Sequence, residues 1–484
     1  MENERILNKI LFCDETLSHE EYDLLEKEKE NINKEIWLLN KKLMLLEMIK
    51  YYNELKNSGK TKEEIIRFYY EDKNAVEYAE EYLKEHLLLK DNMFGYPANM
   101  LESKGIIKYL RFIESKLYLR NNCGGPNPKI DRGFYLMDSK ENEMKIIETM
   151  CKNMNVDPKD YWGYVTAGGT EGNLWGINTG YELYPNAKLY YSSSGHYSIP
   201  KGVKIGNGTI TLPYQEIKSF PNGEIDADEL IANAYDAWKT YRIPAIVVLT
   251  WGTTVLGACD NVKYIKQELD KLGIPNYIHL DAAMYGGIPS NQKDSPAIKD
   301  LKELNPDSIS ISLHKYLANT EVGGIVICKK EIFERKNMKQ VEYIGQTDPT
   351  YLGSRDFLPF STLQQIKQLV ERSNENDYSK NINIFIEEME KNNIPYFRNE
   401  YSNTFIIDLP CKEFAEKYQL ATFDNDTKAH VIIFPSHKEE NIKSLVEELS
   451  KYIDKSKAIK KIKKINKNII NFQIKCNNSD NYNT

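Results

Sequence analysis

The sequence predicts an α/β fold with a large domain built on a mostly parallel sheet, a smaller C-terminal α+β domain and N-terminal helices. Three observations predict it. Short apolar runs alternate with amphipathic helical stretches from 91 to 330, which is typical of a parallel sheet covered by helices on both faces. Longer helical patterns with few strands occupy 331–454, and residues 1–90 carry apolar side chains at near-helical spacing.

The first 90 residues are interpreted as a helical extension that covers a subunit surface. Ser18 and Glu21 form a capping box, in which each side chain can bond a free backbone N–H at a helix start. Apolar residues then recur at helical spacing as far as Ile49, and Thr61 with Glu64 offers a second capping box. A catalytic role for this segment is not indicated.

The large domain, 91–330, contains apolar runs that predict strands at 161–166, 188–192, 244–251, 276–281, 307–312 and 324–328. Helices are expected between them at 170–183, 226–239 and 260–272, and Asp226 with Glu229 indicates where the second of these begins.

In the small domain, 331–454, we expect helices at 361–372, 382–392 and 440–452 and strands at 403–408 and 429–434. The remaining residues, 455–484, are rich in Lys and Asn and are predicted to be a flexible tail.

Composition narrows the classes of function. The net charge of −7 argues against nucleic acid as the main partner, because phosphate binding requires a concentrated basic face. Seven cysteines lie far apart without a CxxC pair, so neither a zinc site nor a redox motif is indicated and a reducing cytosol is expected. No secretory signal and no apolar run of about 20 residues occurs. We therefore expect a cytoplasmic protein without a metal, nucleic-acid or membrane partner.

The first candidate site residue is Lys315, which follows the predicted strand 307–312 in the motif Ser312-Leu313-His314-Lys315. Open α/β sheets bind ligands beyond the carboxyl ends of their strands. A partly desolvated lysine there can form a Schiff base with an aldehyde cofactor. Taken alone, the motif is more often an ordinary surface lysine after a strand.

A second candidate, Asp281, ends the strand 276–281 and is followed by Ala282 and Ala283. A carboxylate in this place can keep the ring nitrogen of pyridoxal phosphate (PLP) protonated, so that the ring accepts electrons from a breaking bond. The small Ala283 lets a flat ring approach. An isolated aspartate after a strand is more often a cap or turn residue.

Two further motifs follow strands. The turn Thr166-Ala167-Gly168-Gly169-Thr170 leads into a helix, whose free N–H groups suit an anion such as a cofactor phosphate. The Walker pattern is absent, which disfavours a nucleotide. His196, after the strand 188–192, can stack on an aromatic cofactor. Individually these motifs are weak, whereas together they specify an anion cradle, a ring cover, a pyridinium partner and a Schiff-base lysine.

The ordered set of motifs resembles the PLP-dependent group II amino-acid decarboxylases, and within them the histidine and serine decarboxylase branch. The resemblance covers about 91–450 and rests on these segments: GYVTAGGTEGNLWG (163–176), YYSSSGHYSIPKG (190–202), GTTVLGACD (252–260), HLDAA (279–283), SISLHKY (310–316), VEYIGQTDPTYLGSR (341–355) and AHVIIFP (429–435). It implies the fold-type I, aspartate-aminotransferase-like architecture, PLP as cofactor, and a homodimer with active sites at the subunit interface.

The resemblance also implies roles for individual residues. Lys315 would carry the cofactor, with His196 stacked on the ring and Tyr343 as a proton donor in its own or the neighbouring subunit's site. The other implied cofactor-binding residues are Asp281, Ala283, His314, Ser312, Gly169, Thr170 and Thr254. Tyr96 and Asn99 resemble a substrate-pocket segment, and Ser354 lies in a segment, Gly353-Ser354-Arg355, that resembles one reaching across the interface. Asp260 resembles a residue near the cofactor, although helix N-capping explains it equally well.

The resemblance implies a lyase that decarboxylates an L-amino acid, with histidine the first choice of substrate. Departures leave that side chain open: Asp356-Phe357-Leu358 stands where the branch usually has Asn-Gly-His, and Met284-Tyr285-Gly286 where it favours Leu-Ser-Gly. Serine, an aromatic or an acidic amino acid remain alternatives. Two other functions also stay open, namely another fold-type I reaction (transamination or carbon–sulfur lysis) and a non-catalytic PLP-binding protein.

Overall fold

The computed structural model describes residues 78, 82, 89, 91–101, 105–114, 121–126, 133–134, 138–204, 213–336, 338–356, 360–371 and 377–452. The chain divides into two compact units, Met1–Leu88 and Leu89–Thr484, and the fold below is that of the second. The predicted tail and, apart from three residues, the predicted helical extension lie outside the described residues. Within these ranges no helix is both long and apolar enough to cross a bilayer.

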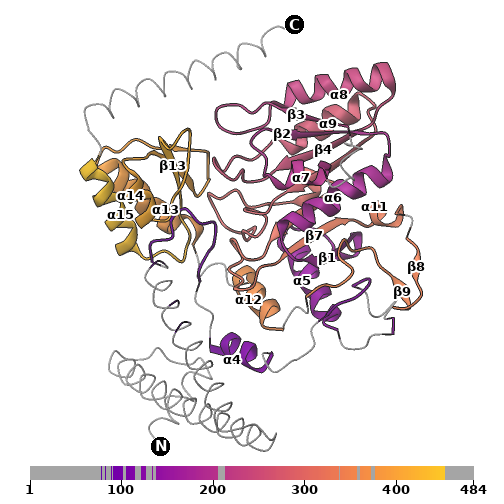
Figure 1. Cartoon of the computed structure of the whole chain (residues 1–484), viewed down its shortest axis with the longest axis horizontal. Helices are drawn as coiled ribbons and strands as arrows, with labels where there is room; N and C mark the ends of the chain where they lie inside the picture. The colour runs from indigo at the N-terminus through magenta and orange to yellow at the C-terminus, as the bar shows by residue number, and fades with distance from the viewer. Residues whose placement is uncertain are drawn as a thin grey trace, which may run out of the picture. The chain divides into compact units, whose positions relative to one another are not determined.

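A seven-stranded sheet forms the centre of this unit (Figure 1). Its order is β1-β7-β6-β5-β4-β2-β3, and β7 runs antiparallel to both neighbours while the other pairs are parallel. The strands are β1 Tyr161–Thr166, β2 Lys188–Ser192, β3 Tyr214–Ile217, β4 Ala245–Thr250, β5 Asn276–Asp281, β6 Ser308–Ser312 and β7 Gly324–Lys329. Sequence predicted all of these within one residue at each end except β3, a short and largely exposed edge strand.

Helices follow the strands. They are α4 Gly105–Glu114, α5 Lys140–Asn153, the 3₁₀ turn η1 Pro158–Asp160, α6 Gly169–Leu183, α7 Ser198–Lys204, α8 Ala227–Tyr241, α9 Val262–Lys271, α10 Leu301–Leu304 and α11 Lys330–Glu334. The predicted cap of α8 is confirmed, because Asp226 accepts a hydrogen bond from the Glu229 N–H. N-capping of α9 by Asp260 is wrong, since Asn261 caps that helix by accepting from the N–H of Tyr264.

The two faces of β4 show how the layers are built. Val247 and Leu249 belong to one apolar cluster with Ile265 and Leu269 of α9. Ile246 and Val248 point the other way, into a second cluster that includes Ile177 of α6. Every residue of β4 is buried, as expected for a strand covered by helices on both faces.

The C-terminal part contains a four-stranded antiparallel sheet of order β10-β11-β13-β12. Figure 1 shows α13, α14 and α15 gathered around β13. The elements are the hairpin β8 Gln340–Val341 and β9 Gln346–Thr347, then α12 Phe360–Glu371, α13 Tyr378–Lys391, β10 Phe397–Arg398, β11 Thr404–Asp408, α14 Lys412–Lys417, β12 Ala421–Phe423, β13 Lys428–Ile432 and α15 Glu439–Tyr452. Helix α12 packs against α5 and α4.

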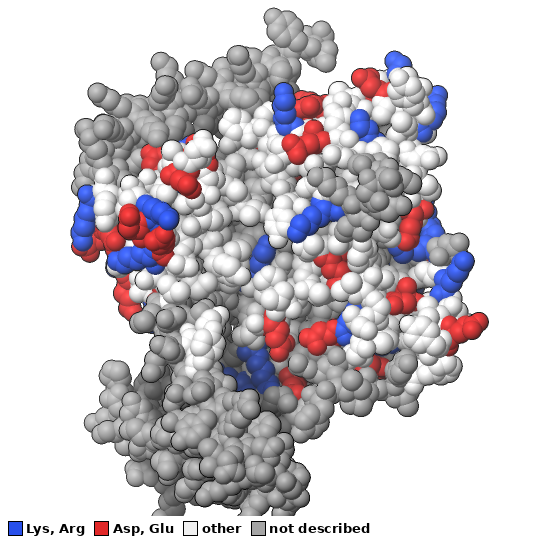
Figure 2. Space-filling model, viewed as in Figure 1, with Lys and Arg blue, Asp and Glu red and all other residues white. Residues whose placement is uncertain are grey.

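Charged side chains of both signs are interspersed on the face shown in Figure 2. Helix α15 illustrates the pairing, because Lys443 bonds Glu439 one turn away and Lys417 of α14 bonds Glu448. Exposed pairs of this kind contribute little to stability, about 1 kcal/mol or less each.

Candidate active site

A pocket of about 340 Å³ lies beyond the carboxyl ends of β1, β2, β5 and β6. The residues that line it include every cofactor-binding candidate from the sequence, namely Gly169, Thr170, His196, Thr254, Asp281, Ala283, Ser312, His314 and Lys315. They come from segments as far apart as 169 and 315, and the parallel strands bring them together because their carboxyl ends share one edge of the sheet.

Lys315 lies in a loop after β6 and points into this pocket. Its carbonyl accepts hydrogen bonds from the N–H groups of Asn99 (3.0 Å) and Ala318 (3.2 Å), so the loop is fixed from both sides. Burial lowers the pKa of the Lys315 amine, and the nearby Asp281 carboxylate opposes that shift. A lowered pKa increases the neutral, nucleophilic fraction of the amine.

Asp281 is buried at the end of β5 and its carboxylate is held by two donors. Its Oδ2 accepts from Asn173 Nδ2 at 2.7 Å, and its Oδ1 accepts from the Ala283 N–H at 3.1 Å. The remaining lone pairs of the carboxylate are available to a partner in the pocket.

His196 lies on the same pocket wall as its neighbour Tyr197, whose ring centroid is 4.2 Å away. The His196 Nδ1 bonds Ser198 Oγ at 2.8 Å and accepts from the Ser198 N–H at 3.2 Å. Burial lowers the pKa of His196, against the opposing effect of the Asp281 carboxylate. The imidazole is therefore expected to be neutral at pH 7.

The glycine turn forms the part of the pocket next to β6. A Cβ added at Gly169 would lie 2.8 Å from Ser312 Oγ and 3.3 Å from the Ala283 Cβ. Glycine at this position thus keeps open the space between the start of α6 and the hydroxyl of Ser312. Free N–H groups at a helix start beside a hydroxyl are suited to bind a phosphate.

These groups fit PLP. A partly buried amine can hold an aldehyde, a buried carboxylate can face a ring nitrogen, an imidazole and a small alanine side chain can cover a flat ring, and a helix start with hydroxyls can hold a phosphate. His314 adds a second imidazole at the pocket, where its Nδ1 lies 3.1 Å from the Gly323 carbonyl.

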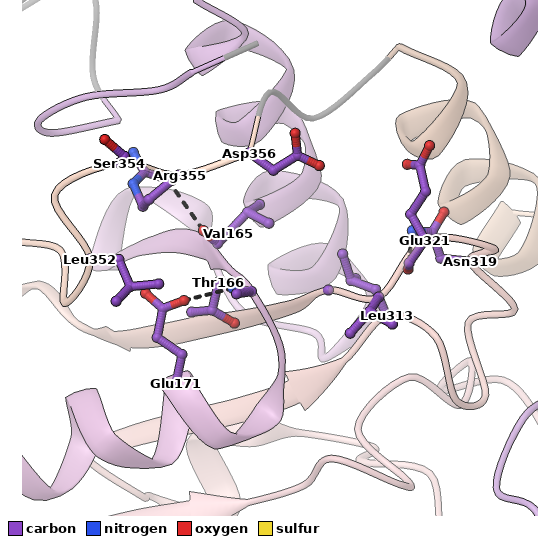
Figure 3. Close-up of a pocket in the computed structure, with 13 residues that line it drawn as sticks. Val165, Thr166, Glu171, Leu313, Asn319, Glu321, Leu352, Ser354, Arg355 and Asp356 are labelled. Atoms are coloured by element: carbon purple, nitrogen blue, oxygen red, sulfur yellow. Dashed lines mark hydrogen bonds between the residues drawn. The ribbon is translucent and has the colours of Figure 1, made fainter. Parts of the chain in front are cut away.

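A smaller pocket of about 80 Å³ borders the first one and shares Ala167, Glu171 and Val322 with it (Figure 3). Figure 3 shows the loop of Ser354, Arg355 and Asp356 along its rim, beside the end of β1. This loop therefore lies next to the glycine turn, although its residues do not line the larger pocket.

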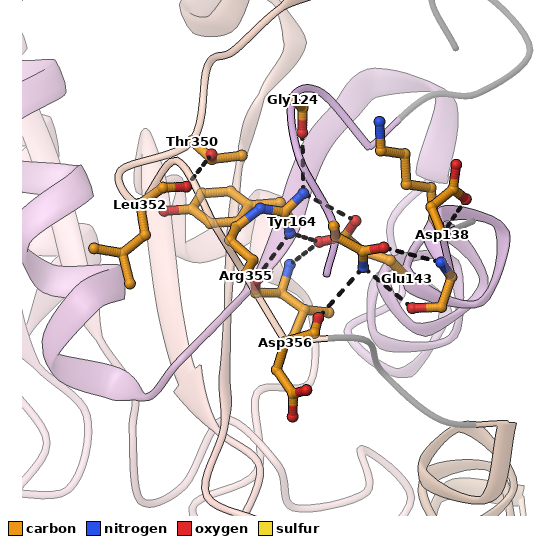
Figure 4. A network of polar contacts seen from close by, with 12 residues as sticks. Gly124, Asp138, Glu143, Tyr164, Thr350, Leu352, Arg355 and Asp356 are labelled. Carbon is orange, nitrogen blue, oxygen red and sulfur yellow. Dashed lines mark hydrogen bonds and ion pairs between the residues drawn. The ribbon is translucent and has the colours of Figure 1, made fainter. Parts of the chain in front are cut away.

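The loop is anchored by a buried network around Arg355 (Figure 4). Arg355 pairs with Glu143 and donates to the carbonyls of Gly124 (3.0 Å) and Val165 (3.3 Å). Its guanidinium also lies 5.2 Å from the Tyr164 ring centroid. Through the Val165 carbonyl, the segment that resembles an interface crossing is attached to β1.

The network continues to the glycine turn. Tyr164 donates its hydroxyl hydrogen to Glu171 Oε1 at 2.9 Å, and Glu171 Oε2 accepts from the Ala167 N–H at 2.6 Å. Burial raises the pKa of Glu171, and its hydrogen bonds oppose the shift. Arg355 and the pocket are thus connected through Tyr164 and Glu171.

Four predicted residues lie outside the larger pocket's lining. Tyr343 is 75% exposed at the turn of the β8–β9 hairpin, and Tyr96 is 55% exposed. Ser354 is exposed and accepts from Asn121 Nδ2 at 3.3 Å. Asn99 is buried and bonds the backbone of the lysine loop, with its N–H on the Lys315 carbonyl and its Nδ2 on the Tyr316 carbonyl, both at 3.0 Å.

Sequence reasoning gave no role to Asn173, which the structure places behind Asp281. One signal was present: Gly172, Gly176 and Gly180 recur every four residues along α6, a spacing that puts small residues on one helix face. A Cβ at Gly176 would lie 2.2 Å from the His279 Nδ1. The glycine face of α6 lets this helix approach the sheet closely, which brings Asn173 to the pocket.

The chain is similar in sequence and in fold to known decarboxylases. The model of the pyridoxal-dependent decarboxylase conserved domain matches residues 179–373. Histidine decarboxylase of Pseudomonas entomophila (strain L48) is 32% identical over 380 residues, which cover 75% of this chain and 88% of that protein. Histidine decarboxylase of Morganella morganii is 31% identical over 351 residues, covering 71% and 87% of the two chains.

Among solved structures, L-methionine decarboxylase from Streptomyces sp. 590 superposes with a TM-score of 0.61 at 21% identity, covering 78% of this chain and 95% of that one. At that identity the likeness shows a shared fold.

Proposed function

This chain belongs to the pyridoxal-dependent decarboxylases, and from that premise we propose that it removes the α-carboxylate of L-histidine and releases the corresponding amine and carbon dioxide. PLP-dependent decarboxylation of an amino acid is what the family performs. Histidine is supported by the curated relatives, which are named for that substrate. The observation that carries the proposal is the convergence of Lys315, Asp281 and His196 on one pocket.

When bound, PLP supplies an electron sink for the electrons of the breaking Cα–carboxylate bond. In our proposal Lys315 holds the cofactor's aldehyde, Ser312, His314, Gly169 and Thr170 hold its phosphate, and Thr254 contributes to the wall. The lowered pKa of the Lys315 amine favours its neutral form, which can attack a carbonyl and later accept or return a proton.

Asp281 and His196 would act on the ring. The Asp281 carboxylate, oriented by Asn173 and the Ala283 N–H, would keep a proton on the ring nitrogen by charge complementarity. His196 would cover one face and Ala283 the other. This arrangement orients the ring, because neither the carboxylate nor the imidazole can rotate without losing a hydrogen bond.

We further propose a homodimer in which Tyr343 protonates the product at the neighbouring subunit's site. Tyr343 is 75% exposed, and two residues that line the pocket, Tyr197 and Val322, are 62% and 74% exposed. Exposed apolar side chains around a pocket are typical of a surface that another chain covers.

A cytoplasmic location is supported by the free cysteines among the described residues.

The function is tested by incubating the cofactor-loaded protein with each of the twenty amino acids and identifying the amine and carbon dioxide by mass spectrometry. L-Histidine should give the largest yield. Lys315→Ala should lose both turnover and the visible absorbance of the bound cofactor. Release of a keto acid without carbon dioxide, or full activity of Lys315→Ala, would overturn the proposal.

The trans role of Tyr343 has its own test. Lys315→Ala and Tyr343→Phe homodimers should each be nearly inactive, whereas mixing and refolding them should restore one functional site in each mixed dimer. Absence of any recovery in confirmed mixed dimers would show that Tyr343 acts on its own subunit, and a fully active Tyr343→Phe homodimer would show that it has no role.

A further inference from the structure

A buried chain of hydrogen bonds lies behind the pocket, and Asn173 of α6 is at its centre. The Asn173 Nδ2 donates to Asp281 Oδ2 (2.7 Å) and to Ser198 Oγ (2.9 Å). Its Oδ1 accepts from Ser310 Oγ (2.5 Å) and from His279 Nε2 (3.1 Å). An amide has two hydrogens and two lone pairs, so every bonding position of this side chain is used and its orientation is fixed.

Donor and acceptor roles follow on the side of His279. Because Asn173 Oδ1 can only accept, His279 carries its hydrogen on Nε2 and its Nδ1 must accept from Ser308 Oγ, 2.7 Å away. Ser308 in turn accepts from the Tyr277 hydroxyl at 2.6 Å. Burial lowers the pKa of His279 to about 4, and a neutral imidazole is what this sequence of bonds requires.

Donor and acceptor roles are also fixed on the pocket side of Asn173. Ser198 Oγ accepts from Asn173, so its own hydrogen is available for His196 Nδ1 at 2.8 Å. The Ser198 N–H also reaches that nitrogen at 3.2 Å. His196 is thereby held as the tautomer with its hydrogen on Nε2.

Close packing keeps the chain in place. A Cβ at Gly176 would lie 2.2 Å from the His279 ring, and one at Gly172 would lie 2.7 Å from the Ser310 Cβ. Asn173, Ser198, His279 and Ser310 are each no more than 1% exposed. Water therefore does not compete for these bonds, and a member that lost its partner would remain buried and unpaired.

We propose that Asn173 is a positioning residue whose single amide sets the hydrogen-bonding state of both groups that face the cofactor ring, Asp281 as acceptor and His196 as the Nε2–H tautomer. This rests on the proposed function, which places those two groups against the ring. The titratable groups that interact with Asp281 are Lys315, His196 and His279, and Asn173 connects two of them to it.

The direct test is Asn173→Asp. It replaces the Nδ2 donor by an oxygen that faces the Asp281 carboxylate, so a hydrogen bond becomes a repulsion. PLP should bind the apo-protein about tenfold more weakly or worse. The pH midpoint of the bound cofactor's absorbance should move by about one unit. This midpoint depends on the charge at the ring nitrogen, and a general loss of packing would not shift it.

The matched control is Asn178→Asp on the same helix. Asn178 also donates to a carboxylate, Glu182 Oε1 at 2.8 Å, but on the exposed face. Asn178→Asp should leave the cofactor affinity and the absorbance midpoint unchanged. Wild-type affinity and midpoint in Asn173→Asp would overturn the proposal.

Ser198→Ala separates the two branches, because it leaves the Asn173–Asp281 bond intact. Cofactor affinity should stay within about twofold of wild type, whereas the pH profile of kcat should change through His196. If Asn173→Asp fails to fold, Ser198→Ala and His279→Gln test the proposal instead. Unchanged absorbance midpoints and unchanged pH profiles of kcat in both variants would refute it. A wild type that binds PLP but releases no amine would instead refute the proposed function, while these binding readouts would still test Asn173.

Discussion

Arg355 and Glu143 form an ion pair whose side chains are only 3% and 0% exposed. Glu143 also accepts from the Val165 N–H at 2.8 Å, so the pair joins the loop of Arg355 to α5 and β1 at once (Figure 4). The two residues are 212 positions apart in the sequence.

Removing one partner of this pair should be strongly destabilising. Arg355→Met leaves the Glu143 carboxylate buried without its cation, and such a loss costs about 3–5 kcal/mol in the free energy of unfolding. Urea unfolding of the apo-protein measures it. Arg355→Met combined with Glu143→Leu should recover part of the loss, because no uncompensated charge remains.

The control for that experiment is an exposed pair. Lys263 and Glu303 are 48% and 63% exposed, and Lys263→Met should cost about 1 kcal/mol or less. Equal losses for Lys263→Met and Arg355→Met would contradict the argument from burial.

Asn99 should matter to turnover through the lysine loop. Asn99→Asp replaces the Nδ2 that donates to the Tyr316 carbonyl by an oxygen that repels it, next to Lys315, which we propose carries the cofactor. We expect kcat to fall by about tenfold or more. A charged group changes the free energy of a hydrogen bond by roughly 1.5–3 kcal/mol, and each 1.4 kcal/mol or so corresponds to about a tenfold change in rate. Steady-state release of carbon dioxide measures it.

Asn155→Asp is the matched control for Asn99. Asn155 also donates its Nδ2 to a carbonyl, that of Lys299, but in an exposed position. Its kcat should equal that of the wild type, and a comparable loss in both variants would assign the Asn99 effect to general destabilisation.

Gly176 should not tolerate even a methyl group. The Cβ of Gly176→Ala would lie 2.2–2.6 Å from three atoms of the buried His279 ring, so α6 or β5 must shift. Although alanine favours a helix by about 1 kcal/mol, we expect a net loss of about 1–3 kcal/mol from overpacking, together with weaker PLP binding. Thermal unfolding and absorbance titration measure the two effects.

Gly105→Ala provides the comparison, because no residue that the structure describes lies within 4 Å of a Cβ at that helical position. Its stability should equal or exceed that of the wild type. A stable, fully binding Gly176→Ala would show that α6 does not need its close approach to the sheet.

Stability should fall between pH 6.5 and 4 through buried histidines. Burial lowers the pKa of His437 to about 4, and its ring stacks on Phe94 with centroids 4.4 Å apart. In this window the unfolded chain binds a proton at His437 that the folded chain does not, so unfolding becomes more favourable as pH falls. His437→Gln should remove about 1.4 kcal/mol per pH unit from that slope.

Urea unfolding of the apo-protein at several pH values between 4 and 7 measures this slope. Some slope should remain in His437→Gln, because the pKa of His279 is also lowered to about 4. An unchanged slope in His437→Gln would mean that His437 is already protonated in the folded protein at these pH values.

The sequence by itself determined the strands that end at the site. β1, β2 and β5 lie where their apolar runs predict them, because a strand covered on both faces has to be almost continuously apolar. Lys315, Asp281, His196 and the glycine turn could be chosen as candidates for the same reason, since each lies at the end of such a run or a few residues after it, and the parallel connection fixes at which edge it lies.

Only the tertiary structure decided which polar groups pair behind and beside the pocket. Asn173 meets His279 across 106 positions and Arg355 meets Glu143 across 212, and no periodicity in the chain specifies such partners. Their pairing depends on how closely α6 approaches β5 and on where the loop after β9 lies. Both are set by the packing of side chains from many segments. Local pattern therefore located the candidate residues that line the pocket, and long-range packing determined which hydrogen bonds orient their side chains.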